Sequence, residues 1–316
     1  MSVVTTHGLE VATAREPIDV PSGCPSRIPT PRPGDPRLAR LSLNQRTTAA
    51  WSLREAIDGC LAAGLGAIGL WREPIASVGL SAAKAWIADS GLRVSSICRG
   101  GFFTSSERAE RRAAYWSNVA AIDETAELGA ATLVLVPGGL PKGDRDIAGA
   151  RARVAEAIAE LAPYARDSGV CLGIEPMHPI FAADRGVVST LHEALDLAEQ
   201  FPASQVGVVV DTFHIWWEPE VLEQIARAAG RIVSYQVAEW ITPLPADTLL
   251  SRGMMGDGHI DFAALTGAVA AAGYSGDVEV EIFNASVWAA PGDQVVETMA
   301  RRYAELVAPH LCPATS

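Results

Sequence analysis

Four oxygen-bearing side chains stand at or near the ends of short apolar runs in the second half of the sequence. They are Glu175, Asp211, Gln236 and Glu281, in the runs 171–175, 206–211, 232–238 and 278–283. Carboxylate and amide oxygens are hard donors, which suit Mn²⁺ or Mg²⁺ better than a thiophilic ion. A lone carboxylate at a strand end is often a helix cap or an arginine partner. Three carboxylates crowded together repel one another unless a cation neutralises them, so the set predicts a divalent metal site.

Two histidines follow the first two candidates at a spacing of three residues. His178 ends the segment Glu-Pro-Met-His that begins at Glu175, and His214 ends Asp-Thr-Phe-His, which begins at Asp211. An imidazole with a pKa near neutrality can move a proton when it lies in a loop above a bound ligand. We interpret His178 as the general base, with substrate hydrogen bonding and a structural role as the alternatives. His214 fits a contact to substrate or to a metal ligand better than the role of base.

Two further residues are candidates for substrate binding. The segment 251–261 reads Ser-Arg-Gly-Met-Met-Gly-Asp-Gly-His-Ile-Asp, and its glycines permit tight turns close to a ligand. Arg252 in this segment could grip a hydroxyl or carbonyl oxygen. Trp217 follows a predicted strand end and could stack on an apolar or sugar face, although core packing explains any single tryptophan equally well.

Eight strand-like runs alternate with eight amphipathic helical ones across residues 37–316. The expected strands are 41–45, 67–71, 94–98, 132–137, 171–175, 206–211, 232–238 and 278–283. The expected helices lie near 53–63, 77–89, 107–128, 146–167, 190–200, 219–229, 261–272 and 292–307. This alternation predicts a single α/β (β/α)8 TIM-barrel catalytic domain, in which the carboxyl ends of the strands face one active-site mouth. Glu279 shares the inward parity of Glu281 one layer deeper, and we expect it to be ion-paired or hydrogen-bonded.

Residues 1–36 have a different composition from the rest of the chain. Six prolines fall within residues 21–36, a density that neither a helix nor a sheet ladder tolerates. We therefore expect an extended N-terminal arm before the barrel, either as a loosely ordered tail or as a strap on a neighbouring subunit.

Composition and charge exclude several classes of function. The 316 residues are 49% hydrophobic, which is enough for a large core. A net charge of −12 repels a polyphosphate backbone, so we expect no nucleic-acid partner. Five cysteines without a Cys-x-x-Cys pair argue against a disulfide framework and a thiolate zinc site. With neither an export signal nor a long apolar stretch in the sequence, we expect no membrane association and a cytoplasmic location.

The ordered set of motifs resembles a known family. Gly-Ile-Glu175-Pro, Val-Val-Asp211-Thr-Phe-His, Tyr-Gln236-Val-Ala-Glu239, Gly256-Asp-Gly-His-Ile-Asp-Phe and Val-Glu281-Ile-Phe look like those of the xylose-isomerase-like TIM barrels, the sugar isomerases and epimerases. The resemblance covers about residues 38–308. It implies that the four candidate positions bind one divalent metal, commonly Mn²⁺, and that the chemistry moves a proton next to a carbonyl. The chain departs from the family at Gln236, where histidine is usual, and at Glu239, where aspartate is common.

The glutamine and the Glu-Pro-Met-His segment are similar to the catalytic α subunits of bacterial C-glycoside deglycosidases, which share this barrel. That resemblance implies that His178 takes the proton α to the ketone of a 3-oxo-glycoside, that the metal stabilises the enediolate, and that the aglycone leaves by β-elimination. It also implies a smaller β subunit, and we allow for an oligomer. The main hypothesis is therefore a metal-dependent lyase on a keto-sugar or glycoside, with a divalent-metal sugar isomerase or epimerase as the alternative.

Two other classes remain for comparison. A DNA-repair endonuclease on a related barrel needs a basic face and a histidine-rich trinuclear zinc site, which an acidic chain with six histidines does not favour. A non-catalytic barrel subunit would retain the ligand residues for stability alone.

Overall fold

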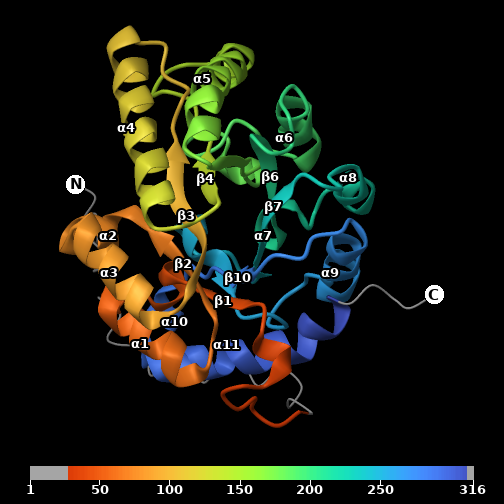
Figure 1. The fold of residues 1–316 in the computed structure, drawn as a ribbon. Coiled ribbons are helices and arrows are strands. Elements are labelled where there is room, and N and C mark those ends of the chain that lie inside the picture. Colours follow the sequence, from red (N-terminus) through yellow and green to blue (C-terminus); the bar gives the residue numbers. More distant parts are fainter. Residues whose placement is uncertain (1–27, 312–316) are drawn as a thin grey trace, which may run out of the picture.

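Eight parallel strands form a closed barrel in the computed structural model, which describes residues 28–311. The strands are β1 (Leu41–Asn44), β2 (Ala67–Trp71), β3 (Arg93–Gly101), β4 (Thr132–Val136), β5 (Cys171–Ile174), β6 (Val206–Asp211), β7 (Ile232–Val237) and β10 (Val278–Val280). Neighbours in the chain pair with one another, and β10 closes the barrel by pairing with both β7 and β1. Figure 1 shows the helices packed around these strands. The predicted TIM barrel is confirmed.

The helices begin and end where local chemistry directs. They are α1 (Leu53–Ala63), α2 (Arg72–Val78), α3 (Leu80–Ser90), α4 (Arg108–Glu127), α5 (Ile147–Asp167), α6 (Leu191–Ala198), α7 (Thr212–Ile215), α8 (Val221–Arg227), α9 (Phe262–Ala271), α10 (Ala285–Ala289) and α11 (Gly292–Leu306). Ser52 and Glu55 form a capping box at the start of α1, and Gly64 ends that helix at φ 71°. The helix expected at 77–89 is α3, separated from the preceding α2 by Gly79 at φ 86°.

Short 3-10 helices occupy several of the connections. They are η1 (Pro36–Leu38), η2 (Gln45–Thr48), η3 (Pro179–Phe181), η4 (Thr248–Ser251) and η5 (Ala308–His310). Two of them, η2 and η3, directly follow the barrel strand β1 and the Glu-Pro-Met-His segment. They therefore shape the loops at the carboxyl ends of the strands.

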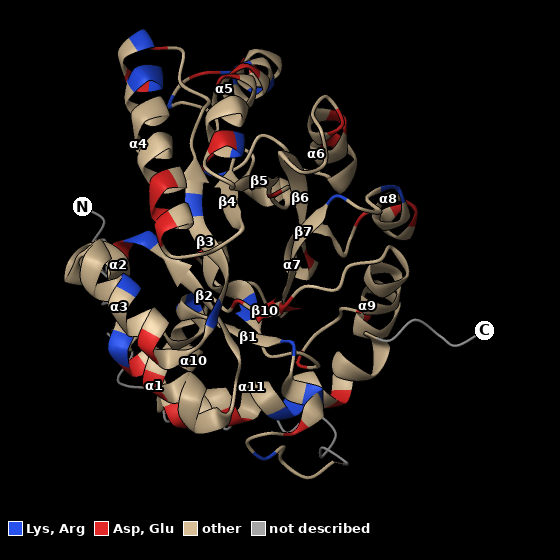
Figure 2. Ribbon diagram, in the orientation of Figure 1, with Lys and Arg blue, Asp and Glu red and all other residues tan. Residues whose placement is uncertain are grey.

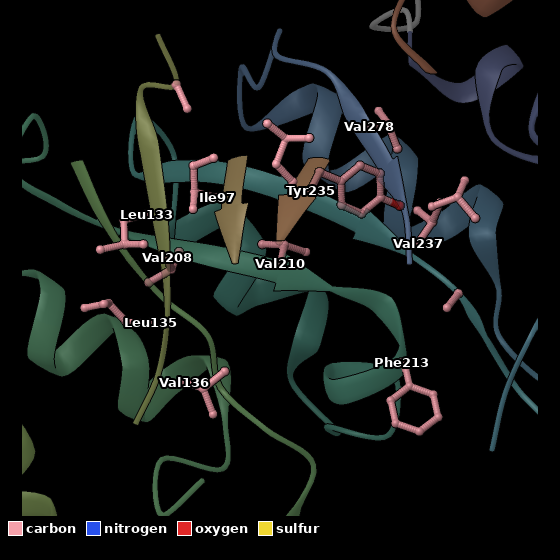
Figure 3. Close-up of a cluster of buried hydrophobic side chains, with 14 of the residues drawn as sticks. Ile97, Leu133, Leu135, Val136, Val208, Val210, Phe213, Tyr235, Val237 and Val278 are labelled. Carbon is pink, nitrogen blue, oxygen red and sulfur yellow. The ribbon is translucent and has the colours of Figure 1, made fainter. Parts of the chain in front are cut away.

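Strand alternation separates two kinds of buried side chain. Val208 and Val210 of β6 belong to the large hydrophobic core between strands and helices, part of which is shown in Figure 3. Val209, between them, belongs to a separate small cluster with Trp71, Cys98 and Val134. Because successive side chains of a strand point to opposite faces, Asp211 shares the face of Val209. The carboxylate at the end of β6 thus points toward the barrel axis rather than toward the helices.

A two-stranded antiparallel sheet lies outside the barrel ladder. It pairs β8 (Glu239–Trp240) with β9 (Arg252–Gly253), so that Trp240 is opposite Arg252. These strands have two residues each, which is too short for hydrophobic alternation to reveal. The sheet folds the segment after β7 back toward the barrel and fixes the backbone of Arg252.

The described end of the predicted N-terminal arm lies against the barrel. Ile28 packs on the core, and Thr30 donates a hydrogen bond to Glu297 of α11 at 3.4 Å. The remaining arm residues, 1–27, lie outside the described residues, as do Cys24 and Cys312. Cys60, Cys98 and Cys171 are free thiols.

Charge and hydropathy are distributed as expected for helices around a barrel. Figure 2 shows basic residues mostly at the upper end of α4 and acidic residues at its lower end, while the strands are largely uncharged. Between residues 28 and 311, none of the helices combines the length and apolar character that crossing a bilayer requires.

Candidate active site

The barrel brings the four candidate metal ligands to one mouth. Glu175 directly follows β5, Asp211 ends β6, Gln236 lies one residue before the end of β7, and Glu281 directly follows β10. In the sheet register Asp211 is the partner of Gln236. All four residues are buried, the most exposed at 5%. The strands therefore carry these side chains at the carboxyl end of the barrel, and their role as metal ligands stays a prediction.

The three carboxylates are electrostatically strained in one another's presence. Burial raises the pKa of Glu175 well above its usual range, and the neighbouring Glu281 and Asp211 raise it further. Burial likewise raises the pKa of Asp211, against the opposing effect of Arg252. The pKa of Glu281 is raised by burial to about 7, although Arg252 again opposes the shift. Each upward pKa shift indicates that the negative charge of the carboxylate is not fully balanced by nearby positive charge. A further cation beside these groups would balance it.

The guanidinium of Arg252 lies among these carboxylates. Its Nη1 donates to Asp211 Oδ2 at 2.7 Å, and its Nη2 lies 3.3 Å from Glu281 Oε2. The guanidinium is itself buried, and Asn284 Nδ2 donates to the backbone carbonyl of Arg252 at 2.8 Å. Arg252 was predicted to grip a substrate oxygen, and in the structure its donors are directed toward the carboxylates and His214.

Gln236 is the clearest sign of a missing partner. It is fully buried, and neither Oε1 nor Nε2 has a hydrogen-bond partner among the described residues. An unpaired buried amide costs about 1–3 kcal/mol. Glu279, one layer deeper and next to Gln236 in the register, differs because Asn44 Nδ2 donates to its Oε2 at 3.0 Å. This confirms that Glu279 is hydrogen-bonded.

A divalent cation fits this donor set by charge and by chemistry. The ionised carboxylates of Glu175, Asp211 and Glu281 carry three negative charges, and Arg252 is the one arginine among the described residues that lies within 4 Å of any of them. Arg99 and Arg46 act on Glu175 and Glu281 only from a greater distance, so ion pairing leaves two charges that a divalent ion would balance. One ligand atom each of Glu175, Asp211 and His214 lie within 4.8 Å of one another. Most of these donors are oxygens, as Mn²⁺ and Mg²⁺ prefer.

His214 has a nitrogen donor next to each of its ring nitrogens. Its Nδ1 accepts a hydrogen bond from the backbone N–H of His178 at 3.1 Å, and its Nε2 lies 3.0 Å from Arg252 Nη2. A neutral imidazole accepts at one nitrogen only, so with Nδ1 accepting, the approach of Arg252 to Nε2 is not a hydrogen bond. Burial lowers the pKa of His214 well below its usual value, and Arg252 lowers it further. The ring is therefore neutral, and it positions His178 and Arg252 relative to Asp211.

His178 lies on an aromatic platform beside this cluster. Its ring centroid is 4.6 Å from that of Trp240 and 5.4 Å from that of Trp217. Nδ1 accepts from the N–H of Ile180 at 3.2 Å, so in this arrangement the proton of the neutral ring is on Nε2. Burial lowers the pKa of His178 to about 4, so the ring is neutral at physiological pH. Trp217 supports His178 and donates its indole N–H to the carbonyl of His214 at 2.8 Å.

Glu239 organises the loop that follows β9. Its Oε1 accepts from the N–H groups of Trp240, His259 and Ile260, and its Oε2 accepts from Gly256. The residue is fully buried. The sequence marked Glu239 as a departure from the family pattern but gave no sign of this role, because the donors are backbone groups and three of the four lie in the separate segment 256–260.

A cavity of about 280 Å³ opens beside the metal-ligand candidates. Glu175, Glu281, His214 and Arg252 line it together with Trp71, a tryptophan at a strand end. Other lining side chains were not indicated by the sequence, namely Arg46, Cys98, Arg99, Arg185, Phe283 and Trp288. His178 and Trp217 are not among its lining residues. Arg46 and Arg99 come directly after the predicted strands 41–45 and 94–98, so the strand-end criterion applied to the first half of the barrel would have found them.

Sequence comparison relates the chain to enzymes that act on sugars and related rings. The sequence model described as xylose isomerase-like TIM barrel matches residues 57–305. L-ribulose 3-epimerase from Mesorhizobium japonicum is 29% identical over 136 residues, covering 43% of this chain and 41% of that protein. 3-Dehydroshikimate dehydratase from Pseudomonas aeruginosa is 31% identical over 191 residues, covering 58% of this chain and 27% of that protein. The chain thus spans less than half of the length of either relative.

Solved structures share the whole barrel. A Sinorhizobium meliloti protein is 44% identical with a TM-score of 0.83, covering 85% of this chain and 99% of that one. The IolI protein, solved with a bound zinc atom, is 20% identical with a TM-score of 0.75, covering 86% and 99%. At that identity the likeness to IolI shows the fold alone.

Proposed function

Because the chain belongs to the xylose isomerase-like TIM barrel family, we propose that it is a divalent-metal-dependent enzyme that removes a proton next to the carbonyl of a keto-sugar or related polyhydroxylated ketone. The observation that carries the proposal is the pair of uncompensated negative charges among Glu175, Asp211, Glu281 and Arg252, beside a cavity of about 280 Å³. The names of the relatives, an epimerase and a dehydratase, support chemistry at a carbon next to a carbonyl.

We propose that Glu175, Asp211, Gln236 and Glu281 hold the cation, with Mn²⁺ the expected ion. When bound, it supplies a Lewis acid for the negative charge that develops on the carbonyl oxygen, without which a ketone α-proton is too weakly acidic for a side-chain base. Gln236 donates an oxygen where a histidine would donate a nitrogen, and both are neutral, so the charge balance of the site is unchanged.

The protein's own residues must move the proton. His178 is neutral, its Nε2 has no hydrogen bond among the described residues, and Trp240 and Trp217 pack against its ring. To take a proton at Nε2, the ring must carry its own proton on Nδ1 and give up the hydrogen bond from Ile180, because the tautomer bonded to Ile180 can only donate a proton from Nε2. Glu281 lines the cavity with a pKa of about 7 raised by burial and is the second candidate for proton transfer. His214 and Arg252 keep the arrangement rigid around Asp211.

Proton removal followed by return to the carbon gives epimerisation or isomerisation, and this is the outcome that we propose first, since the L-ribulose 3-epimerase relative carries out such a reaction by name. Elimination of a β substituent is the second candidate. The dehydratase relative and the Gln236 and Glu-Pro-Met-His features favour it, and it includes loss of the aglycone from a 3-oxo-glycoside. The smaller β subunit, the oligomer and the cytoplasmic location remain predictions.

The proposal is tested by metal content and hydrogen exchange. Protein loaded with Mn²⁺ and freed of excess ion is analysed for bound metal, then incubated in D₂O with L-ribulose or 3-dehydroshikimate. We expect one bound ion per chain and metal-dependent deuterium incorporation next to the carbonyl. Glu175→Gln should lose both, whereas Glu223→Gln on the exposed face of α8 should lose neither. Equal metal content in wild type and Glu175→Gln would refute the proposed site.

A second pair of variants assigns the base. His178→Asn should keep its metal and lower the exchange rate by roughly 10²–10⁴-fold if His178 takes the proton. An unchanged rate in that variant would transfer the role to Glu281. Incubation with a 3-oxo-C-glycoside, with and without candidate partner chains, then separates the outcomes, because only the lyase releases the aglycone.

A further inference from the structure

Three arginines in the cavity wall belong to none of the roles described above. Arg46 lies in η2 after β1, Arg99 lies in β3, and Arg185 lies between η3 and α6. Unlike Arg252, they are not bonded to the carboxylates that end the strands. Because they line the same cavity as Glu175 and Glu281, any molecule that fills it contacts both sets.

The three guanidinium groups are close to one another. Arg46 and Arg99 lie against the same indole, 4.2 Å and 5.5 Å from the centroid of the Trp71 ring. Burial lowers the pKa of Arg99, and the positive charges of Arg185 and Arg46 act in the same direction. Placing like charges together in a partly buried wall is unfavourable unless an anion offsets them.

Among the described residues, none of the three arginines forms an ion pair within 4 Å with a buried carboxylate. Glu175 and Glu281 line the same cavity but act on Arg99 and Arg46 only from a greater distance, and Glu73 opposes the lowering of the Arg99 pKa. Among the described residues the Arg99 guanidinium has no hydrogen bond and no ion pair within 4 Å. Arg46 reaches Glu73 at 3.2 Å, but that side chain is 58% exposed. Arg185 lies 3.5 Å from Asp184, which is 60% exposed. The buried Nε atoms of Arg46 and Arg185 have no hydrogen-bond partner.

We propose that the cavity binds a substrate that carries an anionic group, a carboxylate or a phosphate. The anionic group contacts Arg46, Arg99 and Arg185, and the ketone end of the substrate faces Glu175 and Glu281. The inference rests on the proposed function for the ketone end alone. Guanidinium groups form paired, charge-assisted hydrogen bonds with carboxylate and phosphate oxygens, so either anion suits the wall. A neutral sugar would leave these charges without compensation.

The test compares three probes that share a keto-sugar framework. D-Fructose is neutral, D-fructose 6-phosphate carries a phosphate, and 5-keto-D-gluconate carries a carboxylate. Affinity for each is measured by calorimetry on the Mn²⁺-loaded full chain. We expect at least one anionic probe to bind about tenfold or more tightly than D-fructose, the effect of one charge-assisted hydrogen bond. The tighter of the two anionic probes identifies the group.

Variants locate the effect in the wall. Arg99→Gln should reduce the ratio of anionic to neutral affinity by about tenfold, and Arg185→Gln provides the same test if Arg99→Gln does not fold. Arg54→Gln, which removes an exposed arginine paired with Asp58 on α1, is the matched control and should leave the ratio unchanged. Equal or tighter binding of D-fructose, no binding of either anion up to about 10 mM, or an unchanged ratio in Arg99→Gln would overturn the inference. Metal content in Glu175→Gln is measured separately, so failure here does not count against the proposed metal site.

Discussion

The residues of this site differ in how many hydrogen bonds and ion pairs their polar atoms make. The residues with unused polar atoms are the ones that indicate a bound ion or substrate. Arg252 reaches two carboxylates and a histidine, and Glu239 accepts four backbone hydrogen bonds. Gln236, in contrast, has an amide with no hydrogen-bond partner among the described residues, and the Arg99 guanidinium lies over the Trp71 and Phe102 rings without a carboxylate in contact. Groups whose hydrogen bonds are all made within the protein stabilise the fold. Groups with unused hydrogen-bonding atoms indicate where an ion or a substrate binds.

The positive charge of Arg252 balances part of the negative charge of the carboxylates that the proposed cation would also balance. Without Arg252, the stability of the protein should therefore depend more strongly on the bound metal. Arg252→Gln leaves three buried carboxylates with no internal cation, and we expect the metal-free variant to lose about 3–5 kcal/mol of unfolding free energy. A divalent ion should restore more of that loss than it adds to wild type. Thermal unfolding in EDTA and in excess Mn²⁺ measures both. A metal-induced rise in Tm that is no larger in the variant than in wild type would contradict the charge balance.

At the scale of elements, the sequence predicted the parts whose hydrophobic pattern is long enough to read. The strands of the barrel and the helix ends marked by glycine follow from alternation and from left-handed caps such as Gly64. The sheet of β8 and β9 was missed because its strands have two residues each, too few for hydrophobic alternation to mark them. Arg46 and Arg99 follow predicted strand ends in the first half of the barrel, where the strand-end pattern extends to cations, whereas Arg185 lies in a loop that no such pattern marks.

Glu239 should control the loop 253–260. Glu239→Gln replaces one acceptor oxygen by a donor that cannot pair with the N–H of Gly256, and we expect a loss of about 1–3 kcal/mol. Amide hydrogen exchange should accelerate at Gly256 and its neighbours. Asp261→Ala removes only an exposed cap of α9 and serves as the control. Unchanged protection of the Gly256 amide in Glu239→Gln would exclude the assigned role.

Glu218, which bonds to the start of α6, should make the free energy of unfolding depend on pH. It accepts from the N–H of Leu191 at the start of α6, and burial raises its pKa from 4.5 to about 7. The folded state therefore binds more protons than the unfolded state between these values, so this carboxyl favours folding at low pH and loses that contribution as the pH rises from about 4.5 to 7.

Replacement of the carboxyl should remove this dependence. Relative to wild type, Glu218→Gln should gain about 1–3 kcal/mol of unfolding free energy between pH 4.5 and pH 8. Denaturant unfolding of both proteins across this range measures the gain, with the exposed Glu223→Gln as the control. A constant difference between wild type and Glu218→Gln would show that Glu218 does not titrate in this window.

At the scale of the whole molecule, barrel closure assembles the site. Glu175 and Glu281 are separated by more than a hundred residues, yet parallel pairing of β5, β6, β7 and β10 brings their carboxyl ends to one mouth. The sequence could predict this convergence because the topology of the barrel requires it. It could not predict that Arg252 would enter the cluster, because that depends on how the loop after β7 folds back.

The central claim is that one divalent cation lies among the carboxyl ends of these four strands. Anomalous diffraction from crystals grown with Mn²⁺ tests it most directly. The account predicts a single strong peak within bonding distance of Glu175, Asp211, Gln236 and Glu281, with Arg252 at its edge. A map without a peak there, in which the Arg252 guanidinium alone fills the space between the carboxylates, would contradict it.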